Sequence, residues 1–249
     1  MKKILAVIIV VTIMLQTATL SETPYGKISI SKDIELVKIS DNAYVHVSYS
    51  VIGDYGRIAS NGLVFIEGHK AFLFDTPCTD SLTMLLCSWI KDSLKAEVTG
   101  FVPNHWHIDC IGGLGYLKKQ GIESYANQMT IDIAGSKGLP VPSHGFKDSL
   151  QLKLGDKLIE CYYPGAAHST DNIVVWIPSE KILFPGCIVK SMDMNTLGNT
   201  SDGDVKSYPE TLDRIMKRYR DAKIVIPGHG DFGGMELIKH TRQMASRKK

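Results

Sequence analysis

The predicted elements occur in the same order twice along this chain: several strands, one helix, then one more strand. Alternating apolar and polar residues in the first half predict strands over 29–40, 43–50, 62–67, 70–75 and 98–102. Residues 80–94 carry apolar side chains at helical spacing, with Thr79 or Asp80 as the predicted N-cap. The second half is predicted to contain strands over 151–154, 157–163, 172–178, 181–184 and 223–227, with helices over 208–219 and from Met235 onward.

This repeated order predicts a mixed α/β (α+β) fold built from two similar halves. Two sheets that pack face to face, with helices on their outer sides, would bury the apolar faces of both sheets. The predicted architecture is therefore a four-layer αβ/βα sandwich. No Pro-, Ser- or Gly-rich linker divides the 249-residue chain after its first residues, so we expect residues 22–249 to form a single domain.

The first residues predict a secretory signal peptide. Lys2 and Lys3 precede an apolar run over residues 4–15, and small polar residues follow that run. The run is too short to span a bilayer comfortably, although an uncleaved membrane anchor is the alternative interpretation. We expect export to remove approximately residues 1–21 and to leave a periplasmic protein with no stable membrane anchor.

The charge balance argues against a polyanionic partner. The chain has 28 basic residues, and removing Lys2 and Lys3 leaves 26, which equals the 26 acidic residues. A balanced mature chain has no net attraction to nucleic acid or to an anionic lipid surface. We therefore expect neither as a partner.

The segment after strand 98–102 carries the clearest chemical signal. His105, His107 and Asp109 are spaced two residues apart. In an extended segment these three side chains would point to the same side, whereas a helix would turn His107 away from the other two. Two imidazoles and a carboxylate are suitable zinc ligands, so we expect an extended metal-binding segment at a strand end.

Three later residues lie in comparable loops at strand ends. His168 precedes the strand over 172–178, His229 directly follows an apolar run, and Cys187 follows Phe184. A single loop histidine is more often an ordinary polar residue, and a free cysteine is often a small buried apolar one. Their shared position at strand ends favours convergence on one metal site. The remaining histidines are interpreted as structural or solvent-facing: His46, His69, His144 and His240.

Five cysteines cannot all pair with one another. An exported protein that keeps an unpaired thiol needs a reason, because oxidising compartments consume free thiols. Zinc binding by Cys187 would supply that reason, since the metal lowers the pKa of the thiol and protects it. One disulfide among the other four stays open at this stage: Cys78, Cys87, Cys110 and Cys161.

The His-x-His-x-Asp spacing and the three later residues together resemble the class B metallo-β-lactamases of the first subclass. The stretches NHWHIDCIGGLGYL, SYANQMTID, KGLPVP, DNIVVWIP and PGHGDFGG resemble the CcrA/CfiA-type zinc carbapenemases in particular. The resemblance covers nearly the whole mature chain. It implies an enzyme that hydrolyses the β-lactam amide bond of penicillins, cephalosporins and carbapenems and confers antibiotic resistance. We expect the chain to act as a monomer.

The resemblance also implies two Zn²⁺ per chain and a role for each site residue. The first zinc would be held by His105, His107 and His168. The second would be held by Asp109, Cys187 and His229. The implied catalytic residues are Asp109, Lys190 and Asn199.

The same resemblance assigns the residues that would contact the substrate. Lys190 would receive the substrate carboxylate, and Asn199 would lie beside the β-lactam carbonyl. Val51 and Tyr55 lie in the segment that matches the family's mobile flap and would cover apolar substrate groups. Asp75, at the end of an apolar strand, is expected to orient a metal ligand.

Two positions bear on the alternatives. Cys110 follows Asp109 where glyoxalase-like relatives of the same fold carry a metal-binding histidine, which favours the β-lactamase subclass. Ile108 replaces the small or polar residue usual in close relatives, and we expect it to pack beneath the metal loop. The alternatives are an exported zinc hydrolase of another ester, lactone or thioester, and a zinc-binding homologue with a weakened site, which Ile108 best supports.

Overall fold

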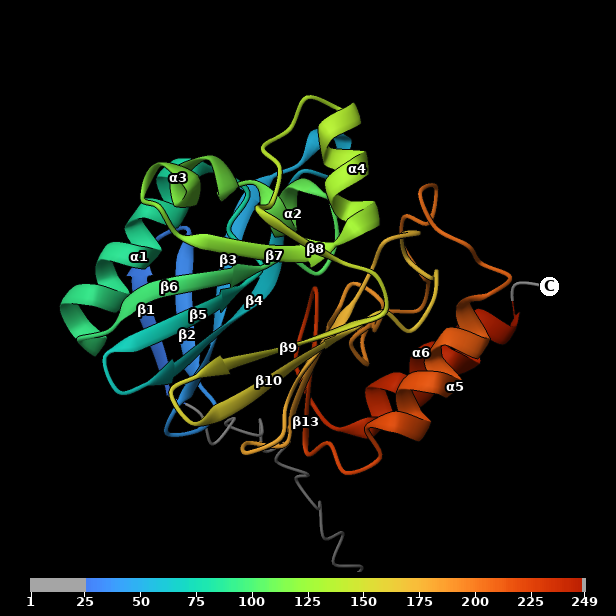
Figure 1. Cartoon of the computed structure of the whole chain (residues 1–249). Helices are drawn as coiled ribbons and strands as arrows, with labels where there is room; N and C mark the ends of the chain where they lie inside the picture. Colours follow the sequence, from blue (N-terminus) through green and yellow to red (C-terminus); the bar gives the residue numbers. More distant parts are fainter. Residues whose placement is uncertain (1–25, 248–249) are drawn as a thin grey trace, which may run out of the picture.

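The computed structural model describes residues 26–247, so the predicted signal peptide lies outside the described residues. Two β-sheets form the centre of the molecule (Figure 1). The first has eight strands hydrogen-bonded in chain order: β1 (Lys27–Ser31), β2 (Ile34–Lys38), β3 (Ala43–Val51), β4 (Arg57–Glu67), β5 (Lys70–Phe74), β6 (Glu97–Val102), β7 (Glu123–Asn127) and β8 (His144–Phe146). The second has the order β13-β12-β11-β10-β9: β9 (Ser149–Leu154), β10 (Lys157–Tyr162), β11 (Val174–Ile177), β12 (Ile182–Gly186) and β13 (Ile224–Pro227).

Each sheet contains a parallel pair of strands joined by a helical crossover. The helices are α1 (Asp80–Leu94), α2 (Ile108–Ile111), α3 (Leu114–Lys119), α4 (Gln128–Ser136), α5 (Tyr208–Arg218) and α6 (Met235–Arg247). Helix α1 connects β5 to its parallel neighbour β6, and α5 connects β12 to its parallel neighbour β13. Parallel strands need such a crossover because the chain must return to the same end of the sheet. The two strand–helix–strand units are the repeat that the sequence predicts.

Three apolar clusters define four layers. On β4, Leu63 and Phe65 face the second sheet and join the central cluster, whereas Val64 points to the opposite side. The central cluster takes side chains from both sheets, such as Phe74 and Phe184. Outer clusters pack α1 and α3 on the first sheet, and α5 and α6 on the second. The four-layer αβ/βα sandwich is thus confirmed.

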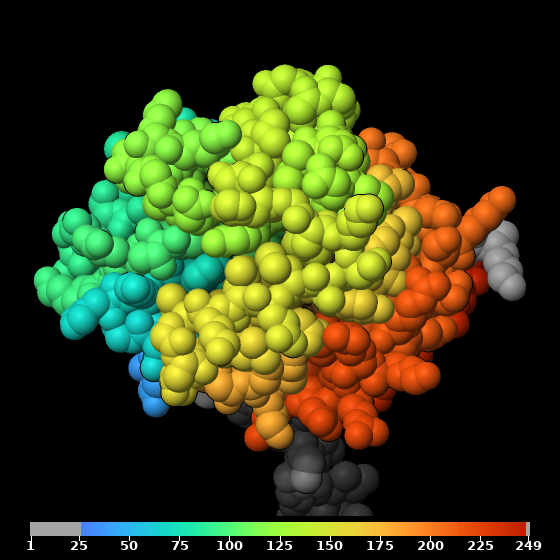
Figure 2. Space-filling view, viewed as in Figure 1, coloured from blue at the N-terminus to red at the C-terminus, as the bar shows by residue number. Residues whose placement is uncertain are grey.

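The two halves pack against each other through the central cluster. Figure 2 shows the middle of the chain, coloured yellow, lying over the junction between the blue-green half and the orange-red half. Among residues 26–247, no helix is long and apolar enough to cross a membrane.

The structure differs from the predicted elements most in two places, and β4 also begins at Arg57, before the predicted strand 62–67. Residues 29–40 form two strands, β1 and β2, because Lys32-Asp33 makes a turn between them. Residues 108–146 contain α2, α3, α4, β7 and β8, for which no element was predicted. Helices α2 and α3 have four and six residues, so neither is long enough to show a helical period.

Candidate metal centre

The loop after β6 is held in place at its first residues. Asn104 N donates to Asp75 Oδ1 at 2.5 Å, and Asn104 Nδ2 donates to the Ile173 carbonyl of the other half. Asp75 is buried and has a φ of 56°. Non-glycine residues rarely adopt this conformation, and it persists only where the surroundings enforce it. Asp75 therefore orients the backbone that enters the metal loop.

The metal loop is not extended throughout, which corrects the sequence prediction. His107 caps α2, and the N–H groups of Cys110 and Ile111 donate to its carbonyl. Asp109 consequently lies on a helical turn. We expected the Ile108 side chain to pack beneath the metal loop. It is instead 42% exposed, so that prediction is wrong. The sequence pattern identifies the residues, but the turn at His107 decides how Asp109 is presented.

Three imidazoles converge from the two halves. His107 Nδ1 lies 2.8 Å from His105 Nε2 and 3.3 Å from His168 Nε2. His105 and His168 are buried, and the rings pack edge to face. His105 shares one candidate metal-binding group with His168 and another with His107, so the three rings adjoin at the site.

A second set of donors adjoins the first. Cys187 Sγ lies 3.5 Å from His229 Nε2 and 3.8 Å from Asp109 Oδ2, and His229 Nε2 lies 3.3 Å from Asp109 Oδ2. Cys187 directly follows β12, and His229 follows β13. Asp75 and the His105 loop follow β5 and β6, the corresponding strands of the first half. The repeated crossover thus brings equivalent strand ends together at the site.

The far nitrogens of three histidines have partners that fix ring orientation. His105 Nδ1 lies 3.3 Å from Cys110 Sγ, and His229 Nδ1 donates to the Ala59 carbonyl at 2.8 Å. His107 Nε2 donates to Asp202 Oδ2 at 3.0 Å. Such contacts leave the other nitrogen of each ring available for a metal. Sequence reasoning missed Asp202, which lies 95 residues from His107 and carries no local signal of the contact.

Burial controls the protonation of two imidazoles. Burial lowers the pKa of His105, and it lowers the pKa of His168 well below the ordinary histidine value. A neutral ring keeps the lone pair that a metal requires. Both rings are therefore poised as ligands near neutral pH.

The second donor set is electrostatically coupled. A hydrogen bond from the Cys110 thiol, together with His229, holds the pKa of Cys187 well below its ordinary value. Burial alone lowers the pKa of His229, but Cys187 and Asp109 outweigh burial and raise that pKa well above the usual range. Such a concentration of negative charge beside an imidazole is suited to a cation.

The donor chemistry fits zinc. Three overlapping groups of donors each have their atoms within 4.8 Å of one another: His105, His168 and Cys187; His105, His107 and Asp109; Asp109, Cys187 and His229. Imidazole nitrogen, thiolate sulfur and carboxylate oxygen are the ligands that zinc takes in proteins. All five cysteines are free, so Cys187 is available and the disulfide left open by the sequence is not formed.

Comparison with known proteins agrees with this geometry. The family model of the metallo-beta-lactamase superfamily matches residues 56–229. A type 2 metallo-beta-lactamase of Bacteroides fragilis is 52% identical over 220 residues, which cover 88% of both chains. The chain belongs to this superfamily. A second type 2 relative, from Bacillus cereus, is 35% identical over 84% of this chain and 81% of its own.

A solved superfamily member has the same fold. The metallo-beta-lactamase from Pontibacter korlensis superposes with a TM-score of 0.83 at 36% identity, covering 86% of this chain and all of the other (100%). The four-layer architecture and the resemblance noted in the sequence are both confirmed by these superfamily members.

The residues expected to contact the substrate lie in different environments. Lys190 is buried, and its Nζ donates to the Cys187 carbonyl at 2.8 Å, so it is not a solvated surface lysine. Asn199 is exposed, and its Oδ1 accepts hydrogen bonds from Ser201. Val51 and Tyr55 are 75% and 66% exposed at the end of β3 and in the 3-10 turn η1 (Gly53–Tyr55). The flap residues are thus free to contact a ligand.

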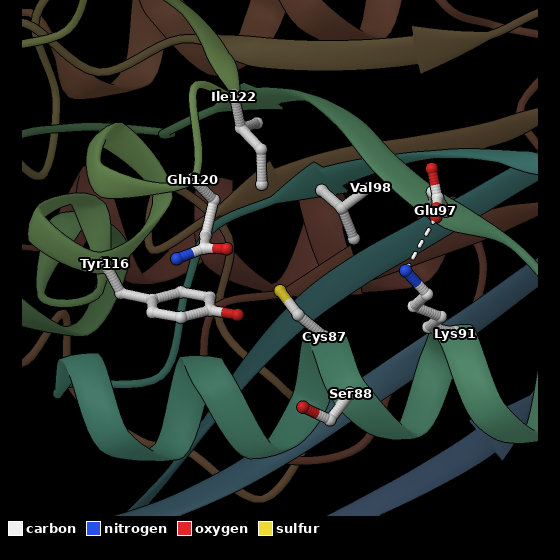
Figure 3. Close-up of a pocket in the computed structure, with 8 residues that line it drawn as sticks. All are labelled: Cys87, Ser88, Lys91, Glu97, Val98, Tyr116, Gln120 and Ile122. Atoms are coloured by element: carbon white, nitrogen blue, oxygen red, sulfur yellow. Dashed lines mark ion pairs between the residues drawn. The ribbon is translucent and has the colours of Figure 1, made fainter.

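A surface cavity elsewhere contains none of the predicted site residues. It measures about 300 Å³ and lies between α1, β6 and the α3–β7 connection (Figure 3). Cys87 and Tyr116 point into it, and Lys91 forms an ion pair with Glu97 at its margin. Burial raises the pKa of Cys87 to about 12, so this thiol is a poor nucleophile at neutral pH.

Proposed function

We propose that this protein hydrolyses the β-lactam amide bond in a zinc-dependent reaction. The observation that carries the proposal is the convergence of six side chains that could hold a metal, from both halves of a metallo-beta-lactamase fold. Its curated relatives bear the same activity in their names. The enzyme is a hydrolase that acts on β-lactams.

Two zinc ions per chain are proposed. His105, His107 and His168 would hold the first, and Asp109, Cys187 and His229 would hold the second. Zinc, when bound, supplies a Lewis acid and an activated water near neutral pH. The support lies in the two adjoining donor sets and in the contacts that Cys110, Ala59 and Asp202 make to the ligand histidines.

The chain's own residues would bind and orient the substrate. Lys190 carries a compact positive charge for the substrate carboxylate, and Asn199 would donate its amide N–H to the β-lactam carbonyl. Asp109 would serve catalysis by holding the second metal against His229 and Cys187. Val51 and Tyr55 would cover apolar substituents of the substrate, because both side chains extend into solvent.

The proposal extends to the substrate range, the export and the oligomeric state of the protein. The substrates would include penicillins, cephalosporins and carbapenems, and their hydrolysis would confer antibiotic resistance. Residues 1–21 would direct export to the periplasm, and residues 22–249 would act as a single monomeric domain. Determination of the mature N-terminus and of the mass in solution tests these points.

Hydrolysis of a chromogenic cephalosporin by the purified mature protein tests the function. We expect turnover in zinc-containing buffer, its loss after dialysis against a chelator, and its recovery on adding zinc. Two alternatives predict other results. A hydrolase of another ester, lactone or thioester would bind zinc but leave the cephalosporin intact, and a weakened homologue would bind zinc with no hydrolysis of any of these compounds.

A further inference from the structure

Lys190 and Asn199 lie on one long irregular segment. Residues 187–207 join β12 to α5 and contain turns but no helix or strand. A segment of this kind has little intrinsic rigidity, because its backbone groups are not held in a ladder of hydrogen bonds. Residues that bind one substrate from such a segment need contacts that hold their backbone in register.

Helix α6 makes two of these contacts, from consecutive residues. Thr241 Oγ1 accepts the backbone N–H of Lys190 at 2.8 Å and donates to the Leu237 carbonyl at 2.8 Å. His240 Nε2 donates to the Met194 carbonyl at 2.7 Å. Thr241 therefore fixes the residue expected to bind the carboxylate, and His240 fixes the middle of the segment.

Packing and further hydrogen bonds hold the rest of the segment, including those of Thr170 N to the Asp202 carbonyl and Asp204 N to the Ala167 carbonyl. Leu197 is buried in the cluster between the second sheet, α5 and α6. Tyr208 Oη donates to the Ile188 carbonyl at 2.7 Å, just before Lys190. Between Ile188 and Leu197, the segment's backbone is hydrogen-bonded to two side chains from outside the segment in the described structure. These belong to His240 and Thr241.

We propose that His240 and Thr241 are positioning residues that set the height and angle of the Lys190–Asn199 segment for substrate binding. The proposal rests on the proposed function, because it gives the segment its task. Neither residue is hydrogen-bonded to a candidate metal ligand in the described structure, so the effect acts through the backbone of the Lys190–Asn199 segment. His240, whose sequence context predicts a structural or solvent-facing residue, would then have a functional role.

Three variants of α6 separate positioning from simple helix stability. His240→Ala removes the N–H donor, His240→Gln retains an N–H at the position of Nε2, and Lys239→Ala changes an exposed neighbour on the same helix. For a penicillin with its free carboxylate, we expect His240→Ala to raise KM about fivefold, the equivalent of one ordinary hydrogen bond, with kcat and zinc content nearly unchanged. His240→Gln should restore most of the wild-type KM, and Lys239→Ala should leave it unaltered.

The methyl ester of the same penicillin provides the decisive comparison. The ester lacks the charge that Lys190 would bind, so His240→Ala should change its KM much less than that of the acid. In a Lys190→Ala background, His240→Ala should likewise add little, since coupled residues are not additive. An equal rise in KM for the acid and the ester, or an unchanged KM with a lowered melting temperature, would overturn the proposal.

Hydrogen exchange separates failure of this inference from failure of the proposed function. In the zinc-loaded protein, peptides spanning residues 188–200 should exchange faster in His240→Ala than in the wild type or in Lys239→Ala. This readout needs no substrate. Unchanged exchange would contradict the positioning role, even if the enzyme is active. Faster exchange in a protein that hydrolyses no β-lactam would support the positioning role of His240 and refute the proposed activity.

Discussion

Single residues at this site are specialised by their surroundings more than by their type. Cys187 is one of five free cysteines, yet it is the one with a strongly lowered pKa, while burial raises the pKa of Cys161 and Cys87. The difference comes from the Cys110 thiol and His229, which together stabilise negative charge on Cys187 strongly enough to outweigh burial. Its thiolate is therefore the chemically distinct member of the set.

Replacing Cys187 with Ser should weaken the second metal position selectively. Serine offers a harder oxygen that does not ionise near neutral pH, so a soft donor is lost while the three imidazoles are untouched. We expect bound zinc to fall from about two ions to about one per chain. Metal analysis after dialysis checks this, with Cys161→Ser as the control. Equal loss of both ions would identify Cys187 as a structural residue.

His46 is a second residue whose surroundings determine its behaviour. It is buried on β3, its Nε2 lies 3.1 Å from the Asp75 carbonyl, and its Nδ1 has no hydrogen-bond partner among residues 26–247. Burial lowers the pKa of His46 to about 4, despite opposing backbone contacts. The folded protein therefore keeps this ring neutral at pH values where the unfolded chain is protonated.

This pKa difference predicts acid sensitivity. Because the folded pKa lies below the unfolded value, the unfolded state binds the extra proton, and stability falls as pH decreases from about 6.5 to about 4. The full effect is about 3 kcal/mol. His46→Gln should remove this component. Urea unfolding of the metal-free wild type and variant at pH 7, 5.5 and 4.5 should show a difference that grows with acidity in favour of the variant. Parallel pH profiles would contradict the interpretation.

At the scale of elements, helix ends decide how functional groups are presented. Helix α1 begins where the sequence predicted, with Thr79 Oγ1 accepting the Leu82 N–H at 3.3 Å. Helix α2 begins at Ile108 without a side-chain cap, and its start turns Asp109 toward His229. The first helix end shows a local sequence signal, whereas the second depends on the metal loop.

Thr79→Ala should lower the free energy of unfolding by about 1 kcal/mol, because an N–H at the start of α1 loses its acceptor. Zinc content and the KM for a cephalosporin should stay the same, since Thr79 lies outside the metal centre. Urea denaturation measures the change. Ser88→Ala, at an exposed position inside the same helix, is the control and should cause no loss. A comparable loss in both variants would show that the cap contributes nothing specific.

Both halves of the molecule supply side chains to the candidate metal centre. The first half contributes His105, His107 and Asp109, and the second half contributes His168, Cys187 and His229. Bound zinc would therefore link the two sheets in addition to the apolar cluster between them. Any ligand that binds only the folded state also stabilises that state by mass action.

Removal of zinc should consequently lower the melting temperature of the whole domain. At free zinc about 1,000 times the dissociation constant, the expected stabilisation is about 4 kcal/mol. Thermal unfolding followed by circular dichroism, with zinc and with chelator, tests this. A variant with His105, His107 and His168 all changed to alanine is the control. If these imidazoles bind most of the stabilising metal, the chelator should not change the melting temperature of this variant. An unchanged transition in the wild type after complete metal removal would contradict a linking role.

Patterns in the sequence predicted the layer order, the helix over 80–94 and six candidate metal ligands, which the folded chain brings together. These features follow from local periodicity and from residue types with few alternative uses. Contacts in the folded chain, by contrast, place Asp109 on a helical turn and bury Lys190. They also bring Asp202 to His107 and His240 to the Met194 carbonyl. Those features depend on contacts between residues far apart in the chain. Local patterns carry no information about which distant hydrogen-bonding group will fill a given space.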